Sequence, residues 1–135
     1  MRYLSGEEVL YLHSEIIDET GGMHGVRDAG LFASIIEKPK MKFGGKDLHH
    51  GVFGKAAAYF HGFSMYHVFV DGNKRTAVAA SARFLARNGY ELTATNQGVE
   101  AFALHVVSNK LDLPAIAAWL KAHSRRHNKN RGARD

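Results

Sequence analysis

The sequence contains no cysteine, which excludes disulfide bonds, thiolate catalysis and thiolate zinc sites. It also has no apolar run of about 18 residues, and its beginning, MRYLSGEEVLYLH, carries charges where a signal peptide would be apolar. We therefore expect a cytoplasmic protein with no membrane partner. Nine histidines are possible metal ligands, but none forms an HExxH pair, and His49 and His50 are adjacent rather than on one helix face.

The chain has the length and composition of one domain. Its 135 residues, 45% of them hydrophobic, are enough to bury a core. Much of the net charge of +5 lies in the last residues, HSRRHNKNRGARD, which lack apolar side chains able to form a core. We therefore predict a folded domain over residues 1–122 and a basic, disordered tail over residues 123–135, whose simplest role is solubility.

Helical spacing of apolar residues recurs along the chain and predicts a mainly α fold. The capping box Ser5-Gly6-Glu7-Glu8 starts the first helix, and Asp28 and Asp112 are suited to cap two others. Gly44-Gly45 is suited to a tight turn inside the irregular segment KMKFGGKDLHH. We expect a single compact bundle of about six helices with one short hairpin. The expected helices begin near Ser5, Asp28, Val52, Thr76, Asn96 and Asp112.

Residues 67–75, HVFVDGNKR, hold most of the chemically capable side chains. An apolar, periodic segment from Thr76 to Arg87 follows and predicts a helix, so DGNKR lies where a loop enters a helix. The first backbone N–H groups of a helix lack intrahelical acceptors, and the macrodipole makes that end positive. This turn is therefore suited to bind an anion such as phosphate.

The side chains of this stretch fit phosphate chemistry. Gly72 permits close backbone approach and a positive φ. Lys74 supplies a point charge and Arg75 a planar fork for phosphate oxygens. Asp71 can hold Mg²⁺, and His67 is of the side-chain type that exchanges protons near neutral pH. Together they indicate phosphoryl or nucleotidyl transfer.

Each of these residues also has a simpler interpretation. Asp71-Gly72-Asn73 is an ordinary turn or cap, a histidine beside apolar residues is commonly packed, and Lys74 and Arg75 could be solvated. The combination argues against these interpretations. Cations at a helix N-terminus oppose the dipole by roughly 0.3 to 1 kcal/mol each, which a bound anion would offset.

The stretch resembles the signature of the Fic/Doc superfamily, and Lys74, where most Fic proteins have glycine, resembles the Doc (death-on-curing toxin) branch. The similarity extends to GVRDAGLFASIIEKP and KAAAYFHGF, and covers roughly residues 3–120. Adenylylating Fic proteins usually carry a second arginine where this chain has Val78. Tyr66 and Val68 stand where many members have asparagine and proline. The matching positions are His67, Phe69, Asp71, Asn73, Lys74 and Arg75.

The resemblance implies a toxin-type protein kinase that transfers the terminal phosphate of ATP to a serine or threonine hydroxyl of a Tu-type translation elongation factor, and so blocks translation. His67 would be the general base, Asp71 the Mg²⁺ ligand and Phe69 the anchor of the loop. Gly72 and Asn73 would present backbone and amide donors to phosphate. Lys74 and Arg75 would neutralise the charge that develops in transfer.

Partners follow from the same resemblance. A separate antitoxin would lay an amphipathic segment in an apolar groove of the toxin, since the chain has no convincing (S/T)xxxE(G/N) inhibitory pattern. Fic-type proteins align their target by strand-like pairing with a flap. The segment Lys40 to His50 is similar to that flap in position, with a flexible loop as the equal alternative.

Two alternative functions stay open. The first is adenylyl (AMP) transfer to a protein hydroxyl, which Lys74 and Val78 disfavour. The second is a non-enzymatic basic helical module that binds nucleic acid, favoured only by the net charge and the tail. Nucleic acid is therefore not the expected partner.

Overall fold

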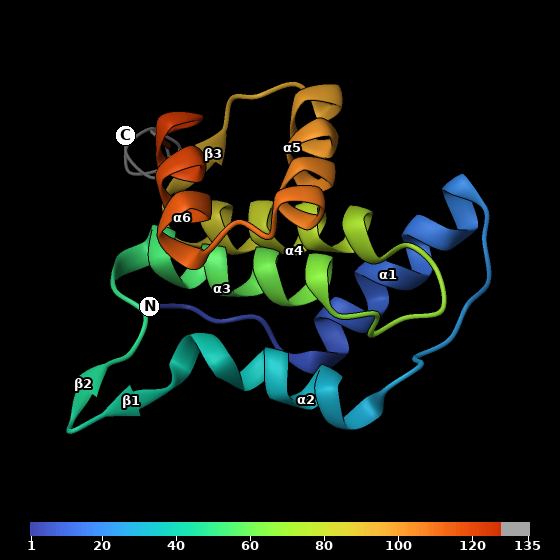
Figure 1. The fold of residues 1–135 in the computed structure, drawn as a ribbon, viewed down its shortest axis with the longest axis horizontal. Helices are drawn as coiled ribbons and strands as arrows, with labels where there is room; N and C mark the ends of the chain where they lie inside the picture. Colours follow the sequence, from blue (N-terminus) through green and yellow to red (C-terminus); the bar gives the residue numbers. More distant parts are fainter. Residues whose placement is uncertain (128–135) are drawn as a thin grey trace, which may run out of the picture.

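Six α-helices make up most of the described part of the chain. A computed structural model gives the structure of residues 1–127. The number and order of the helices confirm the predicted mainly α bundle (Figure 1). They are α1 (Gly6–Thr20), α2 (Ala29–Glu37), α3 (Gly51–Met65), α4 (Asn73–Arg87), α5 (Asn96–Asn109) and α6 (Leu113–Ala122), with a 3₁₀ turn, η1 (Lys38–Lys40), after α2.

Helices α3 and α4 lie side by side at the centre, with α2 along one side of the pair and α5 and α6 along the other (Figure 1). The small and aromatic residues of α3 are buried, including Ala56, Tyr59 and Phe63. Gly62 allows close packing on α2, because a Cβ there would lie 2.7 Å from Cγ2 of Ile35. The central pair carries the candidate site at its junction.

The predicted helix caps are present. Ser5 Oγ accepts the Glu8 N–H at 3.1 Å, Asp28 accepts that of Leu31 at 2.9 Å, and Asp112 accepts that of Ala115 at 3.0 Å. Helix α5 differs, since Thr95 rather than Asn96 is its N-cap. Helix α4 begins at Asn73, earlier than its apolar face indicated, because the residues of its first turn are polar and leave no apolar spacing to detect.

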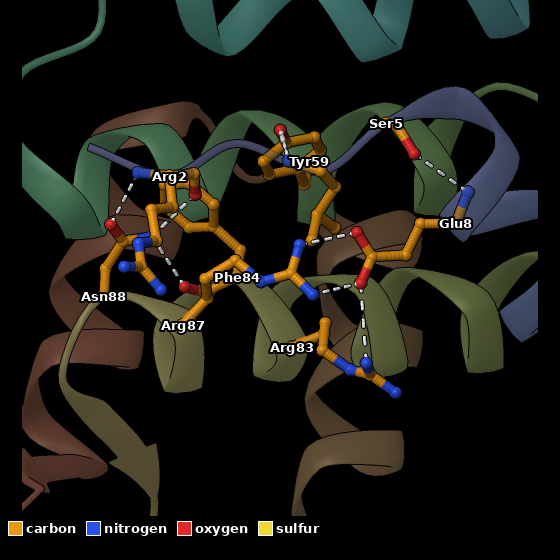
Figure 2. Close-up of polar contacts among 9 residues, drawn as sticks. Arg2, Ser5, Glu8, Tyr59, Arg83, Phe84, Arg87 and Asn88 are labelled. Atoms are coloured by element: carbon orange, nitrogen blue, oxygen red, sulfur yellow. Dashed lines mark hydrogen bonds and ion pairs between the residues drawn. The ribbon is translucent and has the colours of Figure 1, made fainter.

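Polar contacts fasten the N-terminal segment to α3 and α4 (Figure 2). Arg2 and Asn88 exchange two hydrogen bonds of 2.9 Å through the main chain of one and the amide of the other. The Leu4 N–H donates to the Tyr59 hydroxyl at 3.1 Å. The Glu8 carboxylate of α1 accepts from both terminal nitrogens of Arg87 in α4. These contacts fix α1 against α4.

Two small antiparallel sheets complete the described residues. Strands β1 (Lys42–Phe43) and β2 (Lys46–Asp47) form the predicted hairpin around Gly44-Gly45. Strand β3 (Tyr90–Leu92) pairs with β4 (Ser124–Arg126). No helix of residues 1–127 is long and apolar enough to span a membrane.

The second sheet corrects the predicted boundary of the domain. The first residues of the expected tail are ordered, because β4 pairs with β3 over three residue pairs and Arg125 Nε lies 2.7 Å from Glu91 Oε1. The His123 ring also stacks on Trp119 with centroids 3.9 Å apart. The folded domain therefore includes residues 123–127, and the remainder of the predicted tail, residues 128–135, falls outside the described residues.

The hairpin does not lie where the predicted flap would have to act. Asp47 at its base is tied to the first turns of α3, 3.3 Å from Lys55 Nζ. The site loop follows the opposite end of α3, a helix of 15 residues and hence about 22 Å long. Figure 1 shows the hairpin and the α3–α4 junction at opposite ends of the molecule. The segment KMKFGGKDLHH resembles a flap in its position in the sequence, but its position in the fold is away from the site loop.

Candidate active site

The loop after α3 and the first turn of α4 carry all the predicted site residues. Most of them line one depression of about 340 Å³. Phe69 points instead into the core and is fully buried. The depression is lined by His67, Val70, Asp71, Gly72, Asn73, Lys74 and Arg75.

The start of α4 is an open set of hydrogen-bond donors. Gly72 is the N-cap with φ +79°, and it provides no side-chain cap. Within residues 1–127, the backbone N–H groups of residues 72–75 have no acceptor. The first helical bond runs from the Thr76 N–H to the Gly72 carbonyl at 2.9 Å. This arrangement has the donors and the dipole that bind a phosphate group.

Asn73 closes the loop on itself. Its Oδ1 accepts the Phe69 N–H at 2.9 Å, and its Nδ2 donates to the Phe69 carbonyl at 3.0 Å. The side-chain amide expected to donate to phosphate therefore holds the loop. What Asn73 offers an anion directly is its backbone N–H.

Phe69 lies where an anchor of the loop would have to lie. It is fully buried. Its ring contacts Phe32 at 5.8 Å and Phe63 at 6.0 Å between centroids, and stacks on His13 at 3.8 Å. These contacts join the loop to α1, α2 and α3.

The connection between α1 and α2, residues 21–28, runs antiparallel to the site loop. The Arg27 N–H donates to the Val68 carbonyl at 2.7 Å, and the Val70 N–H to the Gly25 carbonyl at 3.1 Å. Arg27 Nε donates to the His67 carbonyl at 2.5 Å. This connection, rather than the hairpin, is the strand-like segment beside the site. Sequence reasoning noted GVRD only for its resemblance to the family.

The charged side chains at the rim are weakly compensated. Lys74 has no ion-pair partner among residues 1–127. Arg75 Nε lies 3.8 Å from Glu100 Oε1 of α5, with both side chains about half exposed. The His67 imidazole is exposed and makes no hydrogen bond within the described part of the chain. Two cations and a free imidazole thus face the solvent around the open N–H groups.

Asp71 fits a metal carried by a nucleotide better than a resident metal centre. Its Oδ2 accepts the Met23 N–H at 2.7 Å, which orients the carboxylate. In residues 1–127 no three side chains of His, Cys, Asp or Glu gather where they could hold a metal. Mg²⁺ in phosphate-transfer sites is commonly held by one or two carboxylates, the phosphates and water. A single carboxylate beside a phosphate site satisfies that requirement.

His13 is the residue of this region that sequence reasoning missed. It is 4% exposed, and its Nε2 lies 2.8 Å from the Asp71 carbonyl oxygen. Its position carried a signal, because it comes four residues after Val9 and four before Ile17. It therefore lies on the apolar face of α1, and a histidine buried there is expected to form a hydrogen bond inside the protein.

The helical fold and the open N-terminus of α4 are consistent with a protein of the Fic type, and comparison with known proteins shows the family. The model of the Fic/DOC family matches residues 3–85, so the chain belongs to that family. Within it the chain falls in the Doc branch. Toxin Doc of Mycolicibacterium smegmatis is 38% identical over 120 residues, which cover 87% of this chain and 90% of that protein. Protein kinase doc of Escherichia phage P1 is 34% identical over 92 residues, 68% and 72% of the two chains. These relatives support a Doc-type toxin and a Fic/Doc-type enzyme.

Proposed function

We propose that this chain is a toxin-type protein kinase that transfers the terminal phosphate of ATP to a serine or threonine hydroxyl of a Tu-type translation elongation factor. The observation that carries the proposal is the set of unpaired N–H groups at residues 72–75, with Lys74, Arg75 and His67 around the same depression. The name of the phage relative, a protein kinase, supports ATP as the phosphate donor.

The transfer uses His67 as the base. The hydroxyl oxygen of the target attacks the terminal phosphorus, the bond from that phosphorus to the bridging oxygen breaks, and ADP leaves. His67 takes the hydroxyl proton, which its exposed and unpaired imidazole is free to do. The N–H groups of α4 with Lys74 and Arg75 stabilise the negative charge on the phosphate oxygens.

Asp71 would hold Mg²⁺ at this site. The ion would supply charge neutralisation for the phosphate oxygens. The Met23 N–H donates to one oxygen of the Asp71 carboxylate and so orients the other oxygen. The protein contributes the placement of that carboxylate next to the α4 N-terminus.

The edge of the α1–α2 connection is suited to align the target. Arg27 N–H and Gly25 C=O face the site loop, so the N–H and C=O of Val26 between them face the other way. Neither group of Val26 has a partner among residues 1–127. An extended target segment that pairs there would lie on the far side of this connection from the site loop, one strand spacing of about 4.8 Å beyond it.

An antitoxin would occupy the apolar groove next to the site. This groove, of about 340 Å³, lies between α1, α4 and α5 and ends at Arg75. Its apolar lining includes Ile16, Val78 and Ala82. An amphipathic segment that buries its apolar face there would reach Arg75 and compete with phosphate.

The alternative activity is adenylyl transfer. Val78 lines the apolar groove and supplies no charge where adenylylating relatives have a second arginine. Lys74 in the first turn of α4, where most Fic proteins have glycine, also favours phosphoryl transfer. The nucleic-acid module has only the net charge in its favour.

Transfer of label from ATP to a purified elongation factor Tu tests the proposal. The reaction is run in parallel with γ-labelled and α-labelled ATP, with His67→Ala as the control. Label from the γ position that disappears in the variant is the expected result. Label from the α position would establish adenylyl transfer instead. No label from either position would reject the proposed target.

A further inference from the structure

His13 is a buried histidine beside the site that the proposed reaction does not use. Its ring lies flat on Phe69, with centroids 3.8 Å apart and planes 9° apart. Its Nε2 is 2.8 Å from the Asp71 carbonyl oxygen. Because a carbonyl oxygen can only accept, Nε2 carries the hydrogen and donates it. His13 therefore holds the loop through one packing contact and one directed hydrogen bond.

That hydrogen bond sets the direction of a single peptide group. In a trans peptide the C=O and the N–H point in opposite directions, and the described residues contain no cis peptide bond. The Asp71 carbonyl is turned toward α1, so the N–H of Gly72 in the same peptide group is turned away from α1. Gly72 lines the depression, and its N–H has no acceptor within residues 1–127.

This peptide group needs a restraint. Gly72 has φ +79°, and glycine adopts positive and negative φ with similar ease. The opposite orientation would place the Asp71 carbonyl oxygen at the depression and remove one N–H donor from it. A carbonyl oxygen there would repel a phosphate group. The chain thus holds a flexible residue at the position where the direction of an N–H matters most.

We propose that His13 is a positioning residue for anion binding: donation from Nε2 to the Asp71 carbonyl keeps the Gly72 N–H directed at the phosphate site. The inference rests on the proposed function in taking that anion to be a phosphate of ATP. Ile17, one turn further along α1, assists by packing, since its Cδ1 lies 3.0 Å from the Cβ position of Gly72.

Two substitutions separate the hydrogen bond from the packing contact. His13→Phe keeps a flat ring against Phe69 and removes the donor. His13→Gln keeps a donor at a similar reach and removes the ring. His49→Phe is the matched control, because His49 is also buried, at 8% exposure, and its Nε2 has no partner among the described residues. It precedes α3, at the end remote from the site.

Binding is measured by titrating inorganic pyrophosphate and following the amide resonance of Gly72 in ¹H–¹⁵N spectra. We expect His13→Phe to weaken binding about tenfold, the effect of losing one well-placed hydrogen bond. His13→Gln and His49→Phe should bind within about threefold of the unmodified chain. Melting temperatures show whether each variant is folded. If His13→Phe does not fold, His13→Leu, which also keeps apolar bulk and removes the donor, takes its place in the comparison with His13→Gln.

Three results would overturn the inference. His13→Phe could bind pyrophosphate as tightly as the unmodified chain. His13→Gln could lose as much affinity as His13→Phe, which would assign the effect to packing. The Gly72 amide of the unmodified chain could be insensitive to pyrophosphate. A chain whose Gly72 amide responds as expected but which transfers no label from ATP would reject the kinase proposal and retain the role of His13.

Discussion

Glu8 and Arg87, which are 79 residues apart, form a paired contact in which both carboxylate oxygens accept from the guanidinium. The pair joins the first turn of α1 to the last turn of α4, and Arg83 adds a longer contact of 3.4 Å (Figure 2). Both side chains of the pair are partly buried, with 28% of Arg87 and 20% of Glu8 exposed. Since α4 carries the candidate active site at its other end, this pair helps to set where that site lies relative to α1.

Glu8→Gln is expected to lower the free energy of unfolding by about 1 to 2 kcal/mol at pH 7. The hydrogen bond from Arg87 holds the pKa of Glu8 below its ordinary value of 4.5. A carboxylate with a lowered pKa stabilises the fold above its unfolded pKa, and this stabilisation disappears as the pH falls through the folded pKa. Urea unfolding of both proteins at pH 7 and pH 3 should therefore show a difference that shrinks at low pH. A difference that is equal at both values would contradict this account.

His67→Ala is expected to reduce phosphate transfer by about 10² to 10⁴-fold, the usual effect of removing a general base. Binding of ADP should change little, because the N–H groups of α4 are intact. The measurement is transfer of label together with calorimetric binding of ADP. Equal losses of binding and transfer would show that His67 holds the nucleotide rather than the proton.

Gly72→Ala is expected to abolish pyrophosphate binding and to cost about 1 to 3 kcal/mol of stability. The new Cβ would stand at φ +79° and 3.0 Å from Ile17 Cδ1. Gly45→Ala is the control, since Gly45 has the same φ of +79° in the remote hairpin and nothing within 4 Å of its Cβ position. The control should share the backbone strain and keep the affinity. Equal affinities for Gly72→Ala and Gly45→Ala would remove the crowding argument.

Asn73→Ala is expected to loosen the site loop, because both hydrogen bonds to the Phe69 main chain are lost. Hydrogen exchange of the Phe69 amide should quicken by more than tenfold, as expected for about 1.4 kcal/mol of lost protection. Label transfer should fall with it. Unchanged exchange at Phe69 would mean that the burial of its ring alone holds the loop.

Ala82→Arg is expected to prevent the antitoxin from binding the toxin. A long charged side chain in the groove between α1, α4 and α5 would block an apolar partner segment. Ala82 is remote from the Asn73 amide that holds the site loop and from the open N–H groups of α4. Growth of a susceptible host should stop when the variant is produced with the cognate antitoxin. Continued growth would place the antitoxin on another surface, provided that the variant alone still arrests the cells.

The sequence predicted most of the fold because the fold rests on local patterns. Apolar spacing predicted the six helices, and capping residues predicted three of their starts. The stretch from His67 to Arg75 predicted a loop that enters a helix, which the structure shows, while its binding of an anion stays a prediction. What it could not give depends on which distant segments meet. The partners of Asn73 and the pairing of Arg27 with Val68 leave no periodic trace. The strand Ser124–Arg126 was missed because it is held by the main chain of β3 rather than by apolar side chains.

The separation of the hairpin from the site has a practical use. Lys46 is exposed and lies in β2, beyond the end of α3 opposite to His67. Because the chain contains no cysteine, Lys46→Cys would create a single thiol. A fluorophore attached there would report on the tumbling of the protein and on complex formation with a target or an antitoxin. It would leave the candidate active site and its neighbouring groove unlabelled.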